Sequence, residues 1–232
     1  KSSVPIALLY LMSFSFSDYT KIKNNYCCCY LGDTLEYIVQ LKLLRPSIEK
    51  QLKSINIFIC CKDSHMYLLE NEKNVIPISE MDKSKFGYIR EFKFTGNHPI
   101  LEFITESNLT IDPIYSQQIS DGIGLICPEG IMPTKCLKDK EIDWAKQWMV
   151  NKGYSPLVVG SDINEVLKIE NRPYGKEKID YIDNSAIVVG VENEYLFMSG
   201  SKNKPTFLVP TGLGESLYTQ MFPDGKILKI NL

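Results

Sequence analysis

The sequence predicts an α/β protein built from two open, largely parallel sheets, with any ligand cleft between the two halves. Short apolar runs alternate with helical stretches along the chain, a pattern typical of βαβ units. The apolar runs are continuous rather than alternating, as in strands that are buried on both faces. A polar, proline-containing segment at 112–121 has the composition of a linker. We therefore place an N-terminal domain at 1–115 and a C-terminal domain at 116–232.

In the first half, a strand at 25–31 runs into Gly32-Asp33-Thr34 and then into a helix. Asp33 or Thr34 is expected to cap the start of this helix, and Pro46 is expected to end it. A second helix is expected at 99–106, with proline at its first position. Further strands are expected at 5–12, 55–61, 75–79 and 88–94.

In the second half, the strongest helix signal lies at 139–152, with Gly153 as its C-terminal stop. A shorter helix is expected at 193–198. The strands that complete this half are expected at 122–127, 155–160, 185–191, 205–210 and 226–230.

Composition excludes several functional classes. The 232 residues carry 26 basic and 28 acidic side chains, so a net charge of −2 gives no general attraction to nucleic acid. The apolar stretch at 4–12 is far shorter than the ~20 residues that span a bilayer, and it lacks a cleavage site. Seven cysteines without a C-x-x-C pair predict buried, reduced thiols and no zinc site. We expect a cytoplasmic protein without a metal or cofactor.

In parallel sheets, ligands bind beyond the carboxyl ends of the strands, and several loops of this chain fall there. Asp33, between a strand and a helix, is a candidate general base toward a hydroxyl group, although it could instead be a plain helix cap. The loop at 128–135 offers Gly130 and Lys135, and a lysine there could pair with a diphosphate. The alternative for Lys135 is an exposed surface lysine.

Two further loops are candidates for ligand binding. Glu192 and Asn193 follow a strand and begin a helix, where a glutamate could accept hydrogen bonds from ribose hydroxyls or could simply favour the helix start. Gly212 and Gly214 follow the strand at 205–210, where glycines could cradle a ligand or form an ordinary loop. The G-K-[ST] element of a P-loop is missing, as are G-x-S-x-G and H-E-x-x-H.

Three segments together resemble a known family. They are YLGDTLEYIVQLKLLRP, IGLICPEGIMPTKCLKDKEIDWAKQWMVNKGYSPLVVGSD and NSAIVVGVENEYLFMSGSKNKPTFLVPT. They resemble the lipopolysaccharide heptosyltransferase-like glycosyltransferases of family nine, which have the GT-B fold of two Rossmann-like domains. By this resemblance Asp33 matches the candidate base of the family's G-D turn. Lys135 matches the lysine that contacts the donor diphosphate, and Glu192 falls at the aspartate of the family's D-T-G motif.

The resemblance implies transfer of a sugar from a nucleotide-sugar donor to a hydroxyl group of a glycan or lipid-linked acceptor, in glycan or surface-polysaccharide synthesis. The N-terminal domain would face the acceptor and the C-terminal domain would bind the donor. Peripheral membrane association and the oligomeric state stay open. The chain departs from the family at Asn193, Glu194 and Phe197, where threonine, glycine and histidine are expected. Two alternatives therefore remain, a non-catalytic binding or scaffold protein and a sugar-nucleotide epimerase.

Overall fold

The chain divides into two compact units. Unit 1 is Lys1–Asp112 and unit 2 is Pro113–Leu232. The computed structural model describes residues 27–52, 55–93, 96–116, 122–130, 132–161, 167–211 and 215–230. The expected strand at 5–12, Gly212 and Gly214 lie outside these described residues.

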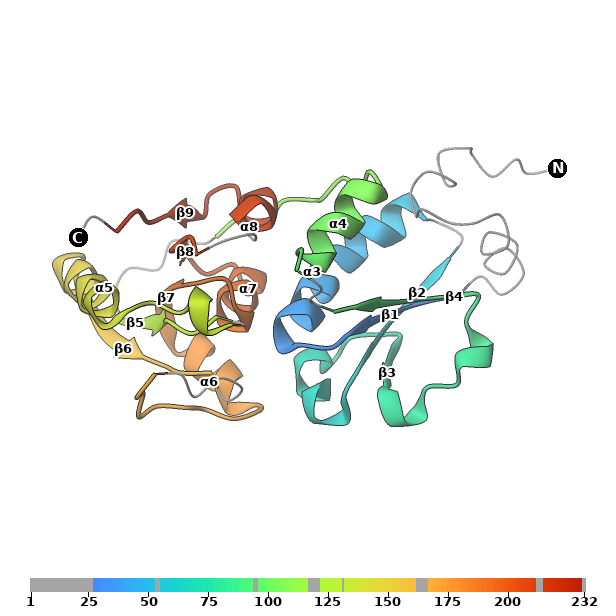
Figure 1. The fold of residues 1–232 in the computed structure, drawn as a ribbon, viewed down its shortest axis with the longest axis horizontal. Coiled ribbons are helices and arrows are strands. Elements are labelled where there is room, and N and C mark those ends of the chain that lie inside the picture. Colours follow the sequence, from blue (N-terminus) through green and yellow to red (C-terminus); the bar gives the residue numbers. More distant parts are fainter. Residues whose placement is uncertain are drawn as a thin grey trace. The chain divides into compact units, whose positions relative to one another are not determined.

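Among the described residues, unit 1 forms a four-stranded parallel sheet in the order β3-β2-β1-β4 (Figure 1). Every strand falls where an apolar run predicts one. The strand predicted at 75–79 is shorter than expected, because the chain turns into a 3-10 helix at Ile78–Glu80. The strands are β1 (Cys27–Gly32), β2 (Asn56–Cys61), β3 (Val75–Pro77) and β4 (Tyr88–Phe92).

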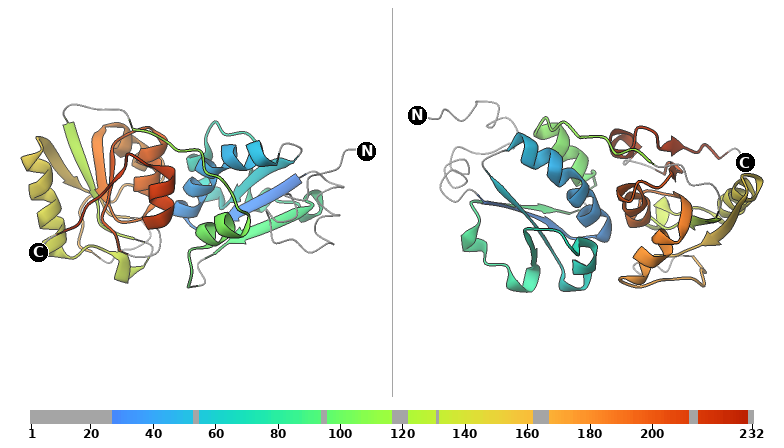
Figure 2. Two further views of the ribbon diagram at one scale, coloured as in Figure 1. Left: turned by 90° about the horizontal axis from the view of Figure 1, so that it is seen from above. Right: turned by 180° about the vertical axis from the view of Figure 1, so that it is seen from behind.

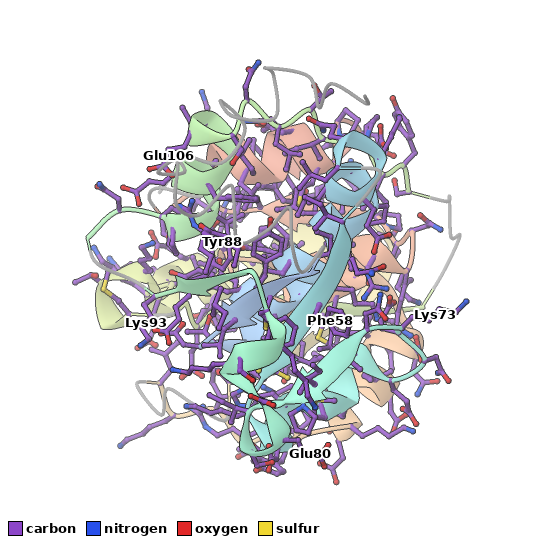
Figure 3. All side chains as sticks on the ribbon, turned by 90° about the vertical axis from the view of Figure 1, so that its right-hand side faces the viewer. Phe58, Lys73, Glu80, Tyr88, Lys93 and Glu106 are labelled. Atoms are coloured by element: carbon purple, nitrogen blue, oxygen red, sulfur yellow. The ribbon has the colours of Figure 1, made fainter. Side chains whose placement is uncertain are left out.

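Helices α3 (Leu35–Gln51) and α4 (Pro99–Glu106) are the two helices expected in unit 1. Phe103 of α4 packs on Tyr30 and Phe92, with ring centroids 5.4 and 5.5 Å apart. A second group of apolar side chains forms a separate cluster, which includes Phe58. Phe58 lies near the middle of unit 1 in Figure 3. This second cluster contains Cys29, Leu31, Phe58, Cys60, Met81, Phe86 and Ile89.

The prediction that Pro46 ends the first helix is wrong. Helix α3 continues through Pro46 to Gln51. Proline inside a helix removes one backbone hydrogen bond and costs about 3 kcal/mol. Beyond it, however, Ser47, Ile48 and Leu52 are buried, and the N–H of Leu52 still closes a turn on the Ile48 carbonyl at 2.8 Å. Burial of this last turn therefore outweighs the local penalty.

In the described part of unit 2, a five-stranded parallel sheet has the order β6-β5-β7-β8-β9. Most of these strands end earlier than predicted, because the chain leaves the sheet at the loops that follow them. The fold class expected from the sequence, two open parallel-sheet halves, is confirmed. The strands are β5 (Gly122–Cys127), β6 (Tyr154–Val158), β7 (Ser185–Gly190), β8 (Thr206–Leu208) and β9 (Lys226–Ile227).

Figure 2 shows helix α5 on one face of this sheet and helices α7 and α8 on the other. Helices α5 and α7 are expected from the sequence, whereas α6 and α8 are not. Trp148 of α5 packs edge-on against Phe207 of β8, with ring centroids 5.0 Å apart. The helices are α5 (Asp139–Asn151), α6 (Glu177–Asp183), α7 (Glu194–Ser201) and α8 (Glu215–Met221).

The cysteines whose side chains the structure describes are free thiols, as predicted. Four are buried and Cys136 is half-buried. Within the described ranges, none of the helices combines the length and the apolar character needed to cross a membrane.

Candidate functional site at the two switch points

Among the described strands, the strand orders define one topological switch point in each unit. In unit 1 the chain moves outward from β1 to β2 and β3, and then returns to the other side of β1 as β4. In unit 2 it moves from β5 to β6 and returns as β7. Ligands of open α/β sheets bind beyond the carboxyl ends of the strands at such points. The candidate sites are therefore the ends of β1 and β4 and the ends of β5 and β7.

Gly32 ends β1 and allows α3 to begin very close to the strand. A Cβ atom at this position would lie 2.9 Å from the Cγ1 atom of Ile38 and 3.1 Å from its backbone nitrogen. Contacts this short require the neighbour to move. The close turn holds Asp33, the next residue, at the end of the sheet.

Thr34, and not Asp33, caps helix α3. The Thr34 hydroxyl accepts a hydrogen bond from the N–H of Tyr37 at 3.2 Å, so the capping role is filled. The Asp33 backbone N–H donates to the Phe92 carbonyl at 3.4 Å, which ties the residue to the end of β4. The Oδ1 atom of Asp33 is buried and accepts no hydrogen bond from the described residues. This carboxylate oxygen is therefore buried without a hydrogen-bond donor among the described residues.

The charges around Asp33 come from the ends of the two neighbouring strands. Burial raises the pKa of the Asp33 carboxyl above its usual value near 3.8, and Lys93 opposes this most strongly, followed by the backbone N–H of Asp33 and by Lys62. Glu91 adds a smaller effect that raises the pKa. A carboxylate with a raised pKa is a stronger base than an exposed one.

In unit 2, the loop after β5 folds back on itself and holds Gly130 against Lys135. A Cβ atom on Gly130 would lie 2.8 Å from the carbonyl oxygen of Lys135 and 2.9 Å from its Cβ atom, so a larger residue would not fit. The loop is closed by the N–H of Leu137, which donates to the Pro128 carbonyl at 2.8 Å. Lys135 ends the 3-10 helix Pro133–Lys135 within this loop.

Asn193 joins the ends of β5 and β7. Its side-chain oxygen caps α7 by accepting from the N–H of Leu196 at 3.2 Å. Its amide nitrogen donates to the carbonyls of Cys127 at 3.2 Å and Glu129 at 3.0 Å. All the hydrogen-bonding groups of this amide are thus engaged within the protein, and its contacts are structural. Its neighbour Glu192 is buried, with 6% of its surface exposed.

Glu129 is a buried carboxylate that sequence reasoning did not single out. The Arg172 guanidinium donates to both of its oxygens, at 2.7 and 2.8 Å. The N–H groups of Ser161 and Leu167 donate to the same carboxylate at 2.7 and 3.0 Å. Arg172 also donates to the carbonyls of these two residues. The pair therefore holds together the β5 loop and the chain that follows β6.

A second buried ion pair lies at the start of α7. The Lys178 ammonium, which is fully buried, donates to the Glu194 carboxylate at 2.8 Å and lies 5.4 Å from the centre of the Tyr195 ring. Burial raises the pKa of the nearby Cys127 thiol well above its usual value, and the Glu194 charge raises it further. Glu194 thus places a carboxylate at the positive end of the helix, where a phosphate would otherwise be favoured.

The structure thus brings Gly130, Lys135, Glu192 and Asn193 to the carboxyl edge of β5 and β7, as the sequence predicts, and places Asp33 at the corresponding edge of unit 1. Other polar residues at these edges were missed: Lys62, Glu91, Lys93, Glu129, Arg172 and Lys178. Lys62 directly follows the strand predicted at 55–61, so the strand end alone could have indicated it. Lys93 lies inside the strand predicted at 88–94 and follows the strand only in the structure, where β4 ends at Phe92. Arg172 and Lys178 have no such signal.

A groove of about 810 Å³ lies elsewhere in unit 2, at the outer edge of β6. It is lined by Asp139, Asp143, Lys146 and residues 156–158 and 167–171, among others, and includes none of the predicted site residues. The candidate catalytic and ligand-binding residues lie at the switch points and not in this groove.

No family model matches the sequence, and no curated protein matches it. Solved structures do match. The iron-containing dodecameric glycosyltransferase TibC from enterotoxigenic E. coli aligns with a TM-score of 0.53 at 9% identity, over 78% of this chain and 59% of that one. A TibC complex with ADP-D-β-D-heptose gives a TM-score of 0.55 at 8% identity, over 79% and 57%. A family 9 glycosyltransferase from Veillonella parvula aligns at 0.49 and 8% identity, over 80% and 82%.

The match covers less than two thirds of the TibC chain. At these identities the likeness concerns the fold, and a fold hosts many activities. The protein is a two-unit, Rossmann-like α/β protein with the GT-B-like architecture. The expected resemblance to a heptosyltransferase is confirmed at the level of the fold.

Proposed function

We propose that this protein transfers a sugar from a nucleotide-sugar donor to a hydroxyl group of a glycan or lipid-linked acceptor. Unit 2 binds the donor, and unit 1 presents Asp33 to the acceptor hydroxyl. The fold likeness to TibC supports this class of reaction, since one TibC structure is a complex with ADP-D-β-D-heptose. The observation that carries the proposal is that the buried Oδ1 atom of Asp33 has no hydrogen-bond partner among the described residues. Thr34, and not Asp33, caps helix α3.

In the proposed reaction, the acceptor oxygen forms a bond to the anomeric carbon as the bond from that carbon to the donor phosphate oxygen breaks. The nucleoside diphosphate leaves with the electron pair, and the acceptor proton passes to Asp33. A carboxylate whose pKa is raised by burial suits this step, because it remains a base while holding the proton more firmly. Lys135 supplies positive charge to the leaving diphosphate, and Glu192 accepts hydrogen bonds from donor hydroxyls.

Donor binding can be tested before any acceptor is known. Both tryptophans of the chain, Trp144 and Trp148, lie in α5, so tryptophan fluorescence, excited selectively over tyrosine, reports on unit 2 alone. We expect a nucleoside diphosphate or nucleotide sugar of one base to raise the melting temperature seen by this signal. The Lys135→Gln variant should lose the rise, and Lys140→Gln, an exposed lysine of α5, should keep it. No rise with any nucleotide at millimolar concentration would contradict the proposal.

The role of Asp33 is tested by Asp33→Asn, which keeps the shape of the side chain and removes the base. We expect transfer to be lost while the nucleotide-dependent rise in melting temperature is retained. Asp63→Asn is the matched control, because Asp63 is an exposed carboxylate just beyond the end of β2. Equal turnover in Asp33→Asn and the unmodified protein would remove Asp33 from the mechanism.

We place the reaction in the cytoplasm, in glycan or surface-polysaccharide synthesis.

A second candidate is a binding protein of the same fold without catalysis. The start of α7 favours it, because the Glu194 carboxylate already occupies the end of the helix dipole and is paired with Lys178. The Asn193 amide is likewise engaged within the protein. Nucleotide binding without turnover on any acceptor, unchanged by Asp33→Asn, is the result this candidate predicts.

A further inference from the structure

We propose that Lys93 is a positioning residue that favours the ionised, proton-accepting form of Asp33 against the effect of burial, and that Glu91 limits this influence. The significance of the inference for catalysis rests on the proposed function. The arrangement itself follows from the sheet of unit 1 and can be tested without a substrate.

The strand register brings Lys93 to Asp33. Gly32 of β1 is paired with Phe92 of β4, and the Asp33 N–H donates to the Phe92 carbonyl. The next residues on the two strands are Asp33 and Lys93. Successive residues of neighbouring parallel strands stay side by side when their register continues, so the two side chains leave the sheet edge together.

Lys62 occupies the equivalent place on the other side of β1. Leu31 is paired with Cys60 of β2, and two residues further along each strand are Asp33 and Lys62. By the register of the strands, Asp33 therefore lies between two lysines, one beyond the end of β2 and one beyond the end of β4. Within the part of the chain that the structure describes, Lys62, Lys93 and Glu91 are the charged side chains that act on it.

Lys93 and Glu91 form a pair of their own. The Lys93 ammonium lies 2.5 Å from the Glu91 carboxylate, and about half of each side chain is exposed. Lys93 lies at the rim of unit 1 in Figure 3, well away from Phe58. Lys93 thus has a direct partner in Glu91 and acts on Asp33 through space. The negative charge of Glu91 offsets part of the effect that the positive charge of Lys93 has on Asp33.

The opposing effects decide how Asp33 is charged. Burial favours the neutral carboxyl form, and Lys93 is the strongest influence in the other direction. Without Lys93, a larger fraction of Asp33 would carry a proton at a given pH, and a protonated carboxyl group cannot accept another from a hydroxyl. Without Glu91, the carboxylate would be ionised at lower pH.

The experiment is a pH titration of the Asp33 carboxyl carbon by NMR, in the full-length chain with ¹³C-labelled aspartate, with the resonance assigned from Asp33→Asn. We expect Lys93→Gln to raise the midpoint and Glu91→Gln to lower it. Lys93→Arg should stay near the unmodified protein, because the positive charge is kept. Lys73→Gln is the control, since Lys73 is an exposed lysine on the opposite side of unit 1 in Figure 3 and should move nothing.

An unchanged midpoint in Lys93→Gln, or a shift of the same sign in Lys93→Gln and Glu91→Gln, would overturn the inference. A general structural disturbance would not give opposite signs in the two variants. High salt should reduce the difference in midpoint between Lys93→Gln and the unmodified protein, because the side chains of Lys93 and Glu91 are partly exposed and salt screens their charges. The titration needs neither donor nor acceptor, so it stands apart from the test of nucleotide binding. If transfer is found, the acid limb of its pH–rate profile should move with the NMR midpoints.

Discussion

Glu129 and Arg172 form a bidentate ion pair at the carboxyl edge of the unit 2 sheet, with nitrogen–oxygen distances of 2.7 and 2.8 Å. Glu129 is almost fully buried, and 18% of the Arg172 side chain is exposed. Two backbone N–H groups complete the surroundings of the carboxylate. The pair links the loop that carries Gly130 and Lys135 to the chain beyond β6, so the candidate donor site depends on it.

We expect Glu129→Gln to destabilise unit 2 by about 3 kcal/mol, because the Arg172 charge loses its partner in a largely buried position. Urea unfolding followed by the fluorescence of Trp144 and Trp148 measures this unit directly. Asp143→Asn is the control, since the Asp143–Lys146 pair is exposed and should contribute less than about 1 kcal/mol. A Glu129→Gln variant as stable as Asp143→Asn would mean that the pair contributes little.

Lys178 and Glu194 allow a sharper test, because both side chains are buried. We expect Lys178→Met to destabilise unit 2 by about 3 kcal/mol, since it leaves the Glu194 carboxylate buried without a cation. Adding Glu194→Gln should recover much of the loss, because the second change removes the uncompensated charge. A double variant that is less stable by the sum of the two single effects would show that the residues act independently.

The fold could be predicted where local pattern decides the structure. Strands β5 and β7 are continuous apolar runs that end in turn residues, and they form where expected. Helix α6 could not be predicted, because one of its two buried residues is Lys178, which is held by Glu194 from a distant part of the chain. The end of α3 was missed for a similar reason, since burial of Ile48 compensates for Pro46.

The candidate site divides in the same way. Asp33 could be selected from the sequence because a strand, a glycine and a helix start surround it in sequence. The influence of Lys93 could not, because it depends on β4 being the neighbour of β1, which the order of elements along the chain leaves open. The engagement of the Asn193 amide likewise depends on carbonyls of β5 and its loop.

Asn193 combines two roles that substitutions can separate. Asn193→Ala removes the helix cap and both hydrogen bonds to carbonyl groups, and should cost about 2 kcal/mol. Asn193→Asp keeps a good capping oxygen but turns an acceptor toward the carbonyls of Cys127 and Glu129. We therefore expect Asp at this position to be no better than Ala, as measured by urea unfolding with tryptophan fluorescence. If Asn193→Asp were about as stable as the unmodified protein, capping of the helix alone would account for the contribution of Asn193.

Asp33 should lower the stability of unit 1 at neutral pH. Its pKa is raised in the folded protein by burial, so the folded state binds the proton more tightly than the unfolded state does. For such a group, stability is greatest below the unfolded pKa, near 3.8, and is lost as the pH rises through the folded value. We expect Asp33→Asn to unfold at a higher temperature than the unmodified protein at pH 7, with the difference shrinking below about pH 4.

Far-UV circular dichroism measures this transition, and tryptophan fluorescence identifies the part that belongs to unit 2. Asp63→Asn should show no such pH-dependent gain. An Asp33→Asn variant that is less stable than the unmodified protein at pH 7 would mean that the ionised carboxylate is favoured by its surroundings. In that case Lys93 and Lys62 would outweigh burial, and Asp33 would be a weaker base than proposed. A gain in stability together with a loss of transfer would instead identify Asp33 as a residue that serves activity at the expense of the fold.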